Sequence, residues 1–127
     1  MFSKRRGVLS RSNRIRWVAR GVGMSIGALW LFIAVCEAAF EKPSWTFEAQ
    51  MMAGLIAGCL VSIVLAWWRE GLGGMLLVIC SIAHSTFAFF SAGHNKALAV
   101  VISGGPFLVI GILFLISWRS ATRSRTE

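Results

Sequence analysis

The chain has 127 residues, of which 57% are hydrophobic and 14% are charged. Its 13 Lys and Arg residues against 5 Asp and Glu residues give a formal net charge of +8. A soluble domain of this length would need more polar side chains to cover its surface, so the composition excludes one and predicts a membrane protein.

Four apolar segments are long enough to cross a bilayer as helices, because about 20 apolar residues span about 30 Å of hydrocarbon. The last three contain no charged residue, and none of the four shows the strict alternation of a membrane barrel strand. The sequence therefore predicts an all-α integral membrane protein with four helices. The predicted spans are about residues 21–40, 51–68, 71–92 and 97–118.

Short links join the predicted spans, which makes neighbouring helices antiparallel. The three links are Glu37 to Gln50, Arg69 with Glu70, and Gly93 to Lys96. The chain is thereby divided into a basic arm at residues 1–20, a four-helix domain at 21–118 and a basic tail at 119–127.

Positive residues are concentrated on one side of these spans. Seven in the arm, one in the second link and three in the tail make eleven, whereas Lys42 and Lys96 lie on the other side. Because positive residues remain on the cytoplasmic side, both termini of the four-helix antiparallel bundle are predicted to be cytoplasmic. The arm is expected to lie on anionic lipid headgroups. Its aromatic residues are Phe2 and Trp17, too few to stack on bases, so no nucleic acid partner is expected.

The first span can also be interpreted as part of a signal sequence, because a basic stretch precedes an apolar one that ends at Cys36. Val35 is unsuitable just before such a cleavage site, and three further spans follow. We therefore expect an uncleaved anchor helix.

Glycines recur at spacings suited to close helix packing, which supplies van der Waals contact where lipid already solvates the side chains. Two pairs match the GxxxG pattern, which predicts either self-association or packing within one bundle. The predicted helix-packing residues are Gly23, Gly27, Gly54, Gly58, Gly73, Gly74, Gly105 and Gly111.

His84 lies deep within the third predicted span, at about the same depth as Pro106 in the fourth. Proline should kink its helix and free the carbonyl of Ile102. We predict that a neutral His84 bonds to Ser103 or to that carbonyl, which makes His84, Ser103 and Pro106 the candidate polar and kink residues.

Three hydroxyl residues surround His84 in the sequence, namely Ser81, Ser85 and Thr86. Together they could line a pathway for protons or small solutes. The simpler interpretation is that these hydroxyls bond to carbonyls of their own helix.

A metal site is a further hypothesis, since Cys80 and His84 are one turn apart and Cys59 has a similar depth. No CxxC or HxxxH pattern and no nearby carboxylate supports it. His94 lies outside the span and offers no second axial haem ligand. We expect no metal, no cofactor and no disulfide framework.

The second half of the chain carries an ordered set of short motifs. They are Ala66 to Glu70, then Gly73 and Gly74, then Gly105 and Pro106, and finally Gly111 to Trp118. In this order they resemble a family of small uncharacterised bacterial membrane proteins with four predicted helices, a domain of unknown function. The resemblance covers about Val61 to Trp118 and implies a fold without an activity.

No nucleophile, base and acid can converge in this sequence, so we expect no enzyme. The sequence favours a multi-pass protein of a bacterial cytoplasmic membrane, with an interaction or accessory role toward a second copy or another membrane protein. The alternative is a transporter or channel for protons or small solutes, in the form of a homodimer that uses His84.

Overall fold

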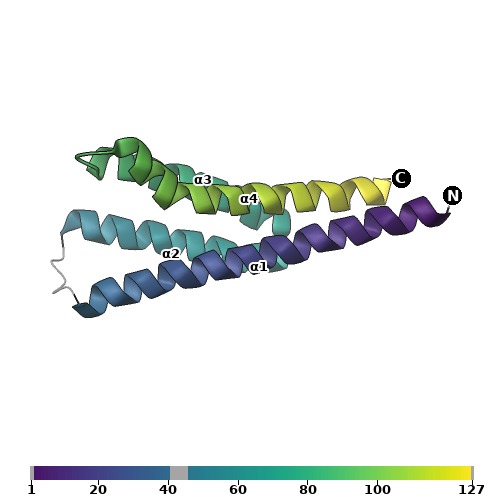
Figure 1. Ribbon diagram of the computed structural model, residues 1–127, viewed down its shortest axis with the longest axis horizontal. Helices are drawn as coiled ribbons and strands as arrows, with labels where there is room; N and C mark the ends of the chain where they lie inside the picture. The colour runs from purple at the N-terminus through teal and green to yellow at the C-terminus, as the bar shows by residue number, and fades with distance from the viewer. Residues whose placement is uncertain (1, 41–45, 127) are drawn as a thin grey trace.

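The computed structural model describes residues 2–40 and 46–126 of the chain. They form four helices: α1 at Phe2–Phe40, α2 at Phe47–Trp68, α3 at Glu70–Ser91 and α4 at Lys96–Thr126. Figure 1 shows α3 and α4 side by side above α1 and α2, with both chain ends at the same end of the bundle. The predicted all-α architecture is confirmed for the described residues.

Each helix contains a stretch long and apolar enough to cross a membrane. The helices differ from the predicted spans mainly at their ends. The first helix continues back through the basic arm to Phe2, and the fourth continues through the basic tail to Thr126. Lys and Arg are good helix formers, so positive charge does not stop either helix at the edge of its apolar stretch.

Arg69 alone separates α2 from α3. Its backbone has φ −135° and ψ 87°, and its N–H donates to the carbonyl of Leu65 at 2.7 Å. A reversal this short brings the two helices together immediately, and a Cβ at Gly73 would overlap the backbone of Ala66. Glycine is therefore required at position 73 by the close approach of α2 and α3.

Asn95 precedes α4 and has a φ of 55°, in the left-handed region that Asn tolerates better than most residues. Its carbonyl accepts a hydrogen bond from Ala99 N at 3.1 Å, which begins the helix. At the start of α2, the Thr46 hydroxyl accepts from Ala49 N at 3.4 Å as an N-cap.

The core lies between all four helices, and α3 and α4 approach closely at two glycines. A Cβ at Gly74 would lie 3.2 Å from the Gly111 carbonyl oxygen, and a Cβ at Gly111 would lie 3.2 Å from the Gly74 carbonyl oxygen. The buried apolar residues around this contact are Ala19, Cys59, Ile63, Ala66, Leu77, Phe107, Ile110 and Phe114.

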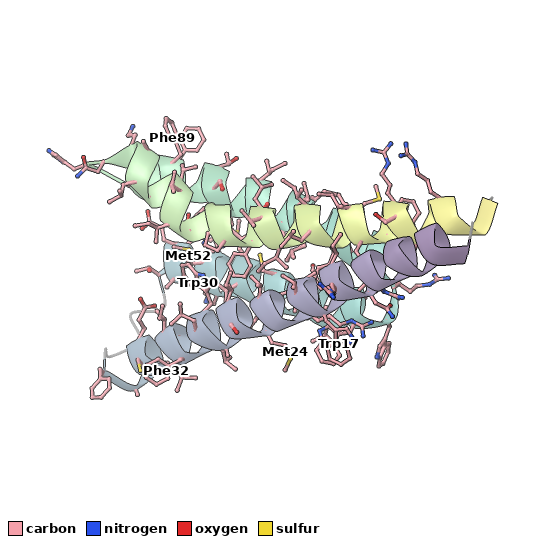
Figure 2. The ribbon with its side chains drawn as sticks, turned by 45° about the vertical axis from the view of Figure 1, so that its right-hand side comes forward. Trp17, Met24, Trp30, Phe32, Met52 and Phe89 are labelled. Atoms are coloured by element: carbon pink, nitrogen blue, oxygen red, sulfur yellow. The ribbon has the colours of Figure 1, made fainter. Side chains whose placement is uncertain are left out.

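Helix α1 is the least covered by the others. Only 11% of its apolar stretch is buried within the chain, compared with 33% for α3 and for α4. Figure 2 shows Met24 and Phe32 pointing away from the other helices, while Trp30 points toward them. The outer half of α1, away from the chain ends, therefore presents apolar side chains to the bilayer.

Candidate functional site

Glu70 is a buried carboxylate at the end of the bundle that carries both chain ends. It is the first residue of α3, and 8% of its surface is exposed. Nε of Arg16 donates to its Oε1 at 2.6 Å, and Nη2 of Arg20 lies 3.6 Å from the same oxygen. The Ser117 hydroxyl donates to Oε2 at 3.3 Å. One carboxylate therefore joins α1, α3 and α4.

The surroundings of the Glu70 side chain supply positive charge and hydrogen-bond donors. A carboxylate in the first turn of a helix interacts favourably with the helix dipole, and two guanidinium groups compensate for its burial. The side chains of Arg16 and Arg20 are 41% and 28% exposed, so solvent screens their attraction in part. The cluster is consequently asymmetric, because the acid is buried more deeply than the bases.

Arg20 extends the cluster to α2. Its Nη2 donates to the carbonyl of Trp67 at 3.3 Å, and its guanidinium carbon lies 5.6 Å from the centroid of the Trp67 ring. Its Nε is buried and has no hydrogen-bond partner among the described residues. All four helices thus meet at the cluster around Glu70.

A pocket of about 770 Å³ opens beside this cluster. It lies between the turn that joins α2 to α3 and the facing parts of α1 and α4. Trp118 forms one wall, where its ring packs on Gly71 so closely that a Cβ there would lie 2.9 Å from it. The lining residues are Arg16, Arg20, Trp67, Trp68, Arg69, Glu70, Gly71, Leu72, Met75, Trp118, Ala121 and Thr122.

His84 occupies a second buried position, nearer the other end of α3. Its ring centroid lies 5.9 Å from that of Trp30, edge to face, and 6.1 Å from that of Phe107, stacked. Trp30 and Phe107 are 5.7 Å apart, so α1, α3 and α4 each contribute one ring to this cluster.

The prediction that His84 forms a hydrogen bond to α4 is wrong. Neither ring nitrogen of His84 has a hydrogen-bond partner in the described part of the chain, and neither has the buried Ser103 hydroxyl. The two helices do meet at the expected depth, but Phe107 rather than Ser103 or the Ile102 carbonyl faces the imidazole ring. Pro106 lies inside α4, which continues on both sides of it.

The hydroxyl groups near His84 mostly bond to their own helix. Ser81 donates to the Val78 carbonyl at 2.8 Å and Thr86 to the Ile82 carbonyl at 2.8 Å. Ser85 lies against Gly104, where an added Cβ would overlap its hydroxyl. The simpler interpretation of these residues is confirmed for Ser81 and Thr86.

The surroundings of Cys59 and Cys80 bear on the hypothesis of a metal site. The sulfur of Cys80 is 3.9 Å from the Ser62 hydroxyl, and Cys59 is buried nearby in α2. Within residues 2–40 and 46–126, no three His, Cys, Asp or Glu side chains form a group that could hold a metal.

The predicted packing glycines lie in three kinds of surroundings. Close approaches that involve backbone atoms of a neighbouring helix occur at Gly73, Gly74 and Gly111. Ordinary side-chain contacts surround Gly23, Gly27 and Gly58. Gly54 faces open space, and the contact given for Gly105 is Val101 of its own helix at 4.0 Å. Gly71 and Gly104, where a Cβ would meet Trp118 and Ser85, were not among the predicted packing residues.

Sequence reasoning also missed the Glu70 cluster. It assigned Glu70 to a tight link and Arg16 and Arg20 to an undivided basic arm. A signal was present, because Glu70 and Glu127 are the only acids on the side that carries eleven basic residues. An isolated acid at the start of an apolar helix needs a partner, and in the structure Arg16 and Arg20 of α1 supply it.

The chain matches the sequence model of a known protein family. The sequence model of a family described as "Domain of unknown function (DUF7670)" matches residues 9–127. The match extends beyond the resemblance over residues 61–118 and includes α1 from residue 9 onward and the link that follows it. No curated protein and no solved structure is significantly similar to the chain.

Proposed function

Because the chain belongs to this family of unknown function, we propose a role for it from its own side chains: a non-enzymatic interaction or accessory protein of the membrane. The proposed location is a bacterial cytoplasmic membrane, with both termini on the cytoplasmic side. The partner is a second copy of the chain or another membrane protein.

The distribution of charge supports the proposed orientation. Arg16, Arg20 and Arg69 lie at the end of the bundle that carries both chain ends, whereas Lys96 begins α4 at the opposite end. Positive residues beside membrane spans favour the cytoplasmic side. Trp67, Trp68 and Trp118 lie at the same end, at the level where tryptophan is enriched in membrane interfaces.

The uneven burial of α1 carries the proposal. The Glu70 cluster fixes α1 to α3 and α4 at the basic end. The outer half of the same helix leaves most of its side chains outside the bundle, among them Leu29, Phe32 and Val35. A helix fixed at one end and uncovered along the rest can pack against a helix of another protein without disturbing its own bundle.

Photo-crosslinking in native membranes tests this role. A photoreactive residue at Phe32, which is 66% exposed, is expected to give a discrete protein adduct. The matched control places the photoreactive residue at Phe90 of α3, which is 78% exposed. It measures random collision with other membrane proteins. Lipid adducts alone at both positions, or equal protein adducts at both, would contradict the proposal.

Transport through His84 is the second candidate, because His84 and Ser103 are both buried and both lack a hydrogen-bond partner among the described residues. Intramembrane histidines of this kind occur in proton pathways. Proton flux into liposomes loaded with a pH-sensitive dye distinguishes the two functions. An accessory protein gives the flux of empty liposomes, whereas a transporter gives a higher flux that His84→Phe abolishes.

A further inference from the structure

The geometry points to a binding site for a phosphate group in the pocket beside Glu70. We propose that its ligand is a phosphate ester, with the headgroup of an anionic phospholipid as the favoured source. This site does not depend on the interaction role proposed above.

The charge of the side chains that line the pocket is the first reason to assign an anionic ligand. The lining of the pocket contains three arginines, Arg16, Arg20 and Arg69, but one acid, Glu70. Both oxygens of that carboxylate already accept hydrogen bonds, Oε1 from Arg16 and Oε2 from Ser117. The pocket therefore has more positive than negative charge, and its acid is already occupied by protein donors.

The hydrogen-bond donors of Arg16 and Arg20 are the second reason to assign a phosphate ligand. Arg16 contacts Glu70 through Nε, and Arg20 contacts Trp67 and Glu70 through Nη2. A guanidinium carries five N–H donors in a planar fork that matches phosphate oxygens, so these side chains can bind a phosphate while they hold Glu70.

The walls of the pocket favour a lipid over a soluble anion. Trp67, Trp68 and Trp118 place three indole rings around the charged groups. Leu72 and Met75 line it from α3 and are about half exposed on the apolar surface of the bundle. A headgroup among the arginines would leave its acyl chains along these residues, and a volume of about 770 Å³ exceeds what a phosphate alone needs.

Binding of three defined ligands by the purified full chain tests the proposal. Native mass spectrometry of the protein in detergent, titrated with phosphatidylglycerol, phosphatidylcholine or glycerol 3-phosphate, measures each affinity. Both lipids carry a phosphodiester, but the arginines repel the choline cation of phosphatidylcholine, so we expect phosphatidylglycerol to bind at least about tenfold more tightly. Tight binding of glycerol 3-phosphate would support the phosphate site but assign it to a soluble ester.

Two arginine variants distinguish the contribution of the pocket to lipid affinity from the contribution of general surface charge. Arg69 lines the pocket and takes no part in the ion pairs described for Glu70, so Arg69→Gln should lower the affinity for phosphatidylglycerol by about tenfold. Arg14→Gln removes the same charge from an exposed position of α1 outside the pocket and should change the affinity less than about twofold. Equal losses in the two variants would overturn the proposal.

Glu70→Gln gives a change in the opposite direction. It keeps the size of the side chain and frees Arg16 and Arg20 from a competing carboxylate, so the affinity for phosphatidylglycerol should rise. A fall in affinity, in protein whose circular dichroism shows that it is folded, would mean that Glu70 itself holds the ligand and would overturn the assignment of an anion.

Discussion

Nε of Arg16 lies 2.6 Å from Oε1 of Glu70, across 54 positions of the chain. This contact links the first helix to the start of the third, beside Ser117 of the fourth. Arginines of the basic segment thus form contacts within the folded structure. The end of the basic segment that precedes the first apolar stretch, with Arg16 and Arg20, therefore packs on the bundle.

Gly73→Ala should destabilise the protein, because its methyl group would overlap the backbone of Ala66 and the one-residue turn at Arg69 leaves no room to separate α2 from α3. We expect a loss of about 2 kcal/mol or more in the free energy of unfolding, measured in mixed detergent and SDS micelles. Gly54→Ala is the control, since Gly54 faces open space, and it should leave the stability unchanged. Equal effects of the two substitutions would show that α2 and α3 are not in this register.

Gly104→Ala should separate α3 from α4, since the added Cβ would overlap the Ser85 hydroxyl. The expected cost is about 1–3 kcal/mol of unfolding free energy, the usual range for overpacking. A second substitution, Ser85→Ala, removes that hydroxyl and should restore part of the loss. Gly105→Ala, at the next position and without such a neighbour, should have a smaller effect. A larger loss at Gly105 than at Gly104 would contradict the packing described.

His84→Phe should preserve the stability of the protein, because the imidazole packs between rings and forms no hydrogen bond with the described residues. His84→Ala should cost about 3 kcal/mol, since it leaves a cavity between Trp30 and Phe107. Thermal unfolding of both variants tests this difference. A loss in His84→Phe as large as that in His84→Ala would contradict the packing between rings.

The positions of the four helices could be predicted because bilayer thickness and backbone hydrogen bonding leave few alternatives for an apolar segment of about 20 residues. The depth of a residue in the membrane was predictable from its position along the helix. His84 does lie opposite the region of Pro106, where Phe107 meets its ring. The rotation of each helix about its axis was not predictable. That rotation decides whether Phe107 or Ser103 faces the histidine.

The Glu70 cluster could not be derived from local pattern, since its members come from three segments far apart in the sequence. Each member has a sufficient local explanation, with arginines that orient the chain and a glutamate that begins a helix. Only packing of α1 against α3 and α4 brings them together. The charge of Glu70, isolated among basic residues, was the one local sign that a partner was needed.

The central claim is that the basic end of the bundle is organised by a buried Glu70 carboxylate shared between Arg16 and Arg20. A mutant cycle on the unfolding free energy tests it most directly. The double variant Arg16→Gln with Arg20→Gln leaves a buried charge unpaired and should cost about 3 kcal/mol, more than Glu70→Gln, which leaves two partly exposed bases. Adding Glu70→Gln to the double variant should restore most of that loss. Additive losses, with the triple variant the least stable, would contradict the claim.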